Sequence, residues 1–265
     1  MPLERLKKLF GGGDDSGDKS GPVGPTLEAE GKPTVRLPID PNSEIARVQK
    51  LTKDPQVRES YITYISSLYE LVARGDTSPG NVCGLVNGLA CNHKLLRDEA
   101  GSTLMRLSHH FSEMCDEFFR IMEQEPEGTR LNLIKAIFKD RPPRDVTVNL
   151  LQRGLADAAE RVRYFAVDRV RHCEIRELVI VLQQQRNVEI EAKMQRFIDF
   201  NVALLVDGFF VEQKPDSGDY LVSVSLGGGG VSSLSVAEED YSPAAVQKAL
   251  EKLRAEWKSI QGEEE

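Results

Sequence analysis

The chain has 265 residues, of which 40% are hydrophobic and 29% charged, and this composition is typical of a soluble protein with a sizeable core. The formal net charge of −8 argues against nucleic-acid binding over the whole surface, because phosphate neutralisation needs clustered Lys and Arg. No apolar run approaches the roughly 20 residues of a membrane span. No secretory signal pattern precedes the four scattered cysteines, so we expect reduced thiols and a cytoplasmic location.

Residues 1–10 form a short, basic, amphipathic segment. Its apolar and basic members are Leu3, Leu6, Lys7, Lys8 and Phe10. A segment of this length is barely helical alone in water and orders only on a surface. We interpret it as a docking segment for a membrane surface or a partner protein, which would place the chain at the membrane periphery in the first case. A frayed chain start is the alternative.

Residues 11–41 are rich in Gly, Pro, Asp and Ser. Such a segment buries too little apolar surface to offset its ordering entropy, so we predict a disordered linker. A flexible chain of this length would reach about 30 Å. The linker would therefore act as a tether that carries the docking segment.

Two stretches share one helical pattern. In 146–173, two amphipathic helices flank a turn at Asp157, and Val162 opens the second helix. In 51–76, the turn falls at Asp54 and Val57 opens the second helix. When the two openings are superposed, apolar residues coincide on a single arc. The matched positions are Val57, Tyr61, Ile65 and Leu68 against Val162, Ala166, Val170 and Cys173.

This pattern resembles the HEAT-like, armadillo-type family of α-helical repeats. The resemblance implies an α-solenoid and assigns structural roles, linking neighbouring repeats, to four residues. These are Asp54, Arg58, Asp157 and Arg163. The spacing of the two copies leaves room for further units, so we predict about five helix pairs over residues 42–206.

The pattern changes after residue 206. Segments 209–211, 220–225 and 231–236 favour strands, and Ser242 with Pro243 opens a final amphipathic helix over 243–260. Residues 207–265 are therefore predicted to form a small α+β cap for the exposed end of the solenoid. The expected fold class is mostly α.

The segment 139–176 contains an excess of basic residues in an otherwise acidic chain. The candidate partner-binding residues are Arg141, Arg144, Arg161, Tyr164 and Arg171. By helical phase, Arg161, Tyr164 and Arg171 face outward, which indicates a surface for an anionic or acidic partner. A solvated face with interleaved ion pairs is the alternative. Arg169 points into the apolar arc, and we expect it to meet a carboxylate or helix-end carbonyls.

The sequence holds no catalytic motif such as G-x-S-x-G or H-E-x-x-H, and its Cys and His spacing fits no compact zinc pattern. We predict no catalytic residue, no metal and no cofactor. The favoured interpretation is a non-enzymatic protein-binding scaffold or adaptor. The alternatives are a nucleic-acid-associated repeat protein that uses the basic segment, and an enzyme of the helical-repeat class.

Overall fold

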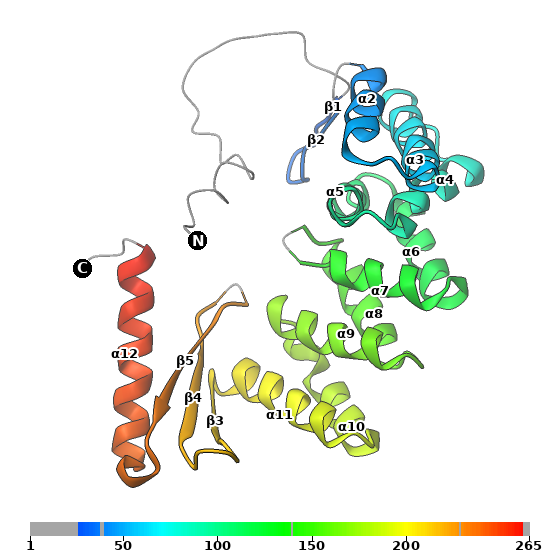
Figure 1. Ribbon diagram of the computed structural model, residues 1–265. Coiled ribbons are helices and arrows are strands. Elements are labelled where there is room, and N and C mark those ends of the chain that lie inside the picture. The colour runs from blue at the N-terminus through cyan, green and yellow to red at the C-terminus, as the bar shows by residue number, and fades with distance from the viewer. Residues whose placement is uncertain (1–25, 38–39, 139, 228, 262–265) are drawn as a thin grey trace.

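The computed structural model describes residues 26–37, 40–138, 140–227 and 229–261 (Figure 1). Within these ranges the chain forms eleven α-helices and two small antiparallel sheets, so the predicted mostly helical class is confirmed. The docking segment, residues 1–10, and most of the predicted linker lie outside the described residues. No helix of the described part is long and apolar enough to cross a membrane.

Ten helices follow one another along the chain after the first hairpin. They are α2 (Pro41–Leu51), α3 (Pro55–Arg74), α4 (Pro79–Ala90), α5 (Lys94–Leu107), α6 (Ser112–Gln124), α7 (Glu127–Ala136), α8 (Arg144–Leu155), α9 (Glu160–His172), α10 (Val179–Val188) and α11 (Ala192–Val206). Prolines occupy the first position of several of them, where a missing N–H costs no helical hydrogen bond. A short 3-10 helix, η1 (Arg176–Leu178), leads into α10.

The helices pack in two layers. In one layer α4, α6, α8 and α10 contact one another in turn, and in the other α5, α7, α9 and α11 do the same. The stack of helices curves from α2 to α11 (Figure 1). One continuous apolar core runs between the layers. Helices cross closely at Gly88, where an added Cβ would lie 2.6 Å from Ala100 Cβ and 2.8 Å from the Tyr64 ring.

A β-hairpin precedes the helices. Strands β1 (Thr26–Leu27) and β2 (Val35–Arg36) pair antiparallel and contact α3 and α5. The prediction of disorder is therefore wrong for residues 26–37. Val35 and Leu37 are buried in the main core, and the Pro33 carbonyl lies 2.8 Å from His110 Nε2. Two buried side chains and a long-range polar contact offset the ordering cost that composition alone indicated.

The C-terminal unit contains the predicted strands and helix. Strands β3 (Phe209–Gln213), β4 (Tyr220–Ser225) and β5 (Val231–Val236) form an antiparallel sheet in that order, and α12 (Pro243–Gln261) follows η2 (Glu238–Asp240). Helix α12 packs on β4 and β5 around a second core that includes Val222, Val224 and Leu250. Helix α11 contacts β3 and β4, so the sheet lies against the last helix pair (Figure 1).

Candidate partner-binding face

Two of the predicted binding residues, Arg141 and Arg144, form contacts with other residues of this chain. Arg144 forms an ion pair with Glu177, with Nη2 2.8 Å from Oε1. Arg141 donates to the carbonyl oxygens of Phe138 and His172, each at 3.2 Å, and thereby helps to cap the carbonyl end of α9. Both side chains are exposed, but their hydrogen-bonding groups already have partners within the chain.

Arg171 is buried, with only 7% of its surface exposed. Its guanidinium donates to Asn201 Oδ1 (2.7 Å) on α11, to the Gly229 carbonyl (2.6 Å) between β4 and β5, and to Asp168 Oδ1 (3.2 Å). The expected outward orientation is therefore wrong for this residue. Helical phase could not reveal it, because α11 and the sheet cover the side of α9 on which Arg171 lies.

Gly229 is required at this contact. Its φ is +78°, which favours glycine, and a Cβ would lie 2.2 Å from the His172 ring. The loop between β4 and β5 can approach the carboxyl end of α9 only because this position has no side chain. The backbone carbonyl that Arg171 binds is thereby brought into reach.

Arg169 has the two kinds of partner expected for it. One guanidinium nitrogen pairs with Asp168, and the other donates to the Lys135 carbonyl at 3.2 Å, in the last turn of α7. Burial alone would raise the pKa of the Asp168 carboxyl, but the bond with His172 and the nearby Arg169 charge hold this pKa below its usual value.

The repeat-motif residues make two kinds of contact. Asp157 binds Arg130 of the preceding helix pair through two hydrogen bonds of 2.7 and 2.8 Å. Arg163 reaches the next pair, where Nε lies 3.1 Å from Glu189 Oε2. The other two residues, Asp54 and Arg58, bond only within the turn between α2 and α3.

A chain of ring and cation contacts crosses the inner layer of helices from α7 to α11. We call it the aromatic–cation face. The ring and cation contacts involve Lys135, Phe138, Tyr164, Phe165 and Phe197. We include in the face Arg161, whose charge acts on Lys135, and Lys193, Arg196 and Phe200, which line the hollow beside Tyr164. Tyr164 stacks on Phe197 with centroids 4.1 Å apart and rings 10° from parallel, which joins α9 to α11. Lys135 Nζ lies 4.4 Å from the Phe165 centroid, which joins α7 to α9.

Two rings of this face are open to solvent. Phe138 is 48% exposed and Tyr164 is 39% exposed. Beside Tyr164, the face sinks into a hollow of about 270 Å³ between α9, α11 and β3. Its lining consists of Glu160, Tyr164, Lys193, Met194, Arg196, Phe197, Phe200 and Glu212. The hollow therefore has an apolar floor with charges of both signs at its rim.

The cations of this face have no carboxylate partners. Among the described residues, the side chains of Lys135, Arg161, Lys193 and Arg196 form neither an ion pair nor a hydrogen bond. Burial, reinforced by the positive charges of Arg161 and Arg97, lowers the pKa of the Lys135 ammonium. Like charges are therefore held close together here, in a chain that is acidic overall.

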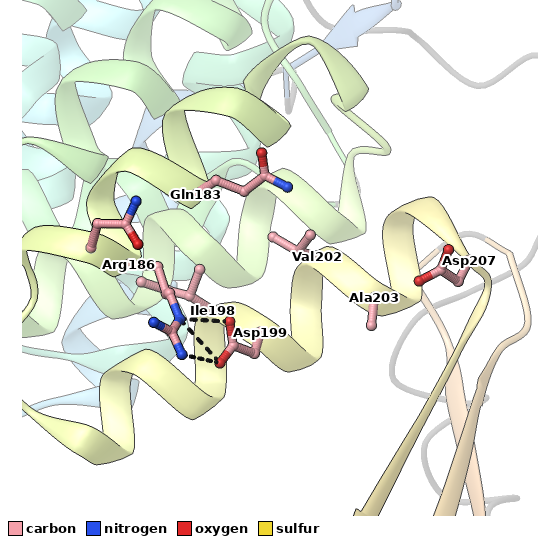
Figure 2. A pocket seen from close by; sticks show the side chains of 8 residues that line it. Gln183, Arg186, Ile198, Asp199, Val202, Ala203 and Asp207 are labelled. Carbon is pink, nitrogen blue, oxygen red and sulfur yellow. Dashed lines mark hydrogen bonds and ion pairs between the residues drawn. The ribbon is translucent and has the colours of Figure 1, made fainter.

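A second hollow, of about 310 Å³, lies between α10 and α11. Figure 2 shows Arg186 and Asp199 paired with each other within it, and their closest atoms are 3.0 Å apart. Because these two charged groups neutralise each other, and Arg186 is the cation among the described lining residues, the hollow offers no unpaired cation for anion binding. It is a weaker candidate than the aromatic–cation face.

Sequence reasoning identified Arg161 and Tyr164 of this face but missed its other members. Phe165, Phe197 and Phe200 have aromatic side chains off the most buried arc of their helices, and that is a usable signal. What single-helix periodicity cannot show is that these rings meet across α7, α9 and α11.

Within the described residues, no group of three or more His, Cys, Asp or Glu side chains is arranged to hold a metal ion. Comparison of the chain with protein-family models, with curated proteins and with solved structures found no match in any of the three.

Proposed function

We propose that this chain is a non-enzymatic protein-binding scaffold or adaptor, built as a short HEAT-like α-solenoid with the C-terminal α+β unit as its cap. The successive packing of like helices in two layers supports this architecture. The bonds of Asp157 and Arg163 to neighbouring helix pairs support it too, because such links are a feature of the family that the sequence resembles. Repeats of this kind need a covered terminal face, which the sheet against α11 would provide.

The observation that carries the binding role is the aromatic–cation face. The exposed ring of Tyr164 lies at the same hollow as Lys193 and Arg196, which lack carboxylate partners within the described chain. The exposed ring of Phe138 lies beside Arg169 on the same face. Aromatic and Arg side chains are the types that contribute most at protein interfaces. The partner is accordingly another protein, whose groups would cover the rings and pair the cations.

A test compares partner capture by three full-length forms in extract from the native host. The first is the wild-type chain, and the second carries Phe138→Ala with Tyr164→Ala. The third carries Ile180→Ala, which removes an apolar side chain that is 66% exposed on α10, away from the face. We expect the wild-type and Ile180→Ala forms to retain the same partner and the double variant to lose it. Equal retention by all three forms would contradict the proposal.

The N-terminal segment, residues 1–10, would supply a second attachment point to a membrane or to another protein, and the chain would work in the cytoplasm. Deleting residues 1–13 should leave the thermal unfolding transition unchanged and abolish recruitment to the site of attachment. A substantial fall in melting temperature on deletion would show that the segment belongs to the fold and that the tether idea is wrong.

The nucleic-acid alternative has less support. In the basic segment 139–176, Arg144, Arg153 and Arg163 are each paired with a carboxylate. The segment therefore presents far less free positive charge than its composition indicates, and phosphate binding depends on free charge.

A further inference from the structure

We infer that the aromatic–cation face binds an acidic segment of its partner protein, one that combines carboxylates with a large apolar side chain. This inference deepens the proposed scaffold function and depends on it. It commits to a protein segment as the occupant, and the contacts described below are what favour this over a nucleic acid.

Two sets of cations in this chain differ in whether they pair with a carboxylate. On the turns and between helix pairs, Arg130, Arg163 and Arg186 each bind a carboxylate of this chain. The cations on the aromatic–cation face bind none among the described residues, although the chain has 42 acidic residues against 34 basic ones. Carboxylates are thus abundant, and Glu160 and Glu212 line the hollow itself, yet among the described residues none of them pairs with these cations.

The positive charges around Lys135 also repel one another. The ammonium of Lys135 lies in the field of the positive charges of Arg161, Arg97 and Arg169, which the Asp98 carboxylate offsets in part. Carboxylates from a bound segment would relieve this repulsion at the moment of binding. The carboxylates would therefore contribute more binding free energy at this face than at an exposed surface whose charges are already neutralised.

The rings argue against stacked nucleobases. One side of the Tyr164 ring is covered by Phe197. Lys135 lies over Phe165, and the Arg169 guanidinium lies 4.8 Å from the Phe138 centroid. Single-stranded nucleic acids bind best on open aromatic platforms for successive bases, and each of these rings already has one side occupied by a neighbour in the chain.

The hollow beside Tyr164 is the reason to expect a large apolar side chain in the bound segment. Met194, Phe197 and Phe200 contribute to its lining, and its volume of about 270 Å³ can hold one large aliphatic or aromatic side chain. Lys193 and Arg196 lie at the same hollow and would pair with acidic residues that flank the anchor. A segment with an apolar anchor between carboxylates fits both features.

The inference is tested by selecting binders from a displayed library of random peptides with the full chain. The selection keeps peptides that bind the wild-type chain and discards those that also bind a Lys135→Glu/Arg161→Glu variant. We expect the selected peptides to be enriched in Asp and Glu, together with Leu, Phe or Trp. Their affinity should fall as salt rises, because the charges involved are partly exposed.

A selected peptide, synthesised with a fluorescent label, then gives the affinities. The double charge reversal should weaken its binding by more than about tenfold, the effect of about 1.4 kcal/mol. The matched control is Arg176→Glu, an exposed charge reversal on η1 and outside the face, which should change affinity by less than about twofold. Circular dichroism and a thermal melt show that both variants are folded.

Three results would overturn the inference. Selected peptides with no acidic excess would remove the charge argument. Tighter binding of single-stranded oligothymidylate than of any selected peptide, with loss in the double variant, would assign the face to nucleic acid. Failure to select any face-dependent peptide, while host capture still requires Phe138 and Tyr164, would refute the acidic segment and leave the scaffold proposal standing. If capture were also independent of the face, both proposals would fail.

Discussion

The two copies of the repeat motif have the same residue types but different contacts. Asp157 and Arg163 each bind a charged residue of a neighbouring helix pair, namely Arg130 and Glu189. Asp54 instead caps α3, and Arg58 donates to the carbonyls at the end of α2. The second copy thus links three helix pairs, whereas the first copy holds together only the turn in which it lies.

The difference arises from the neighbouring residues. Glu189 occupies the position that ends α10, and the corresponding position at the end of α4 is Cys91, which offers no carboxylate. On the other side, α2 follows a β-hairpin, so no preceding described helix pair supplies an equivalent of Arg130. A motif therefore specifies a turn, and the residues around it decide whether that turn also links repeats.

The largest difference between the copies is expected for their aspartates. Asp157→Ala should lower the free energy of unfolding by about 3 kcal/mol, because it leaves the largely buried guanidinium of Arg130 without its carboxylate. Asp54→Ala should cost about 1 kcal/mol, the usual effect of losing a helix cap. Urea denaturation of both variants gives the two values. Equal losses would show that the link between helix pairs adds nothing to stability.

The arginines should differ in the same direction but by less. Arg163→Ala leaves the buried Glu189 without its cation and should cost about 2 kcal/mol. Arg58→Ala removes hydrogen bonds to carbonyls near the surface and should cost about 1 kcal/mol. Thermal unfolding measured at a fixed protein concentration compares them. A larger loss for Arg58 would reverse our interpretation of the two copies.

The Asp157 link should also depend on pH. Burial alone would raise the pKa of this carboxyl, but the hydrogen bonds from Arg130 and the Ala159 N–H outweigh it and lower the pKa. A folded-state pKa below the unfolded value contributes stability above the unfolded pKa, near about 4, and this is lost as pH falls through the folded value. The stability advantage of wild type over Asp157→Asn should therefore be constant above about pH 5 and shrink below about pH 4. A constant difference down to pH 2 would contradict this.

The smallest effect is expected for Arg161, on the same helix as Arg163. Its side chain has no ion pair among the described residues, so Arg161→Glu should change the free energy of unfolding by less than about 0.5 kcal/mol. Chemical denaturation of Arg161→Glu and Arg163→Ala under the same conditions compares their free energies of unfolding. A loss as large as that of Arg163→Ala would mean that Arg161 stabilises the fold, and its assignment to the binding face would need revision.

Much of the helical order follows from local signals. Apolar periodicity and the turns at Asp54, Pro79, Pro143 and Asp157 place the helices to within a few residues, because these signals act over short stretches of chain. The 26–37 hairpin escaped prediction because its stability comes from Val35 and Leu37 packing on distant helices. The candidate face was found only in part, since its rings lie on three helices and meet only once the layers have packed.

The buried contact of Arg171 with the Gly229 carbonyl and Asn201 has a consequence for how the molecule unfolds. Composition and pattern change at residue 206, yet a charged group of the helical part depends on the sheet for one of its hydrogen bonds. If the sheet detached, the buried guanidinium of Arg171 would lose the Gly229 carbonyl as a hydrogen-bond acceptor. Amide hydrogen exchange should therefore show β4, β5 and α9 opening in one cooperative event, so that the change of pattern at residue 206 is not a boundary between independent folding units.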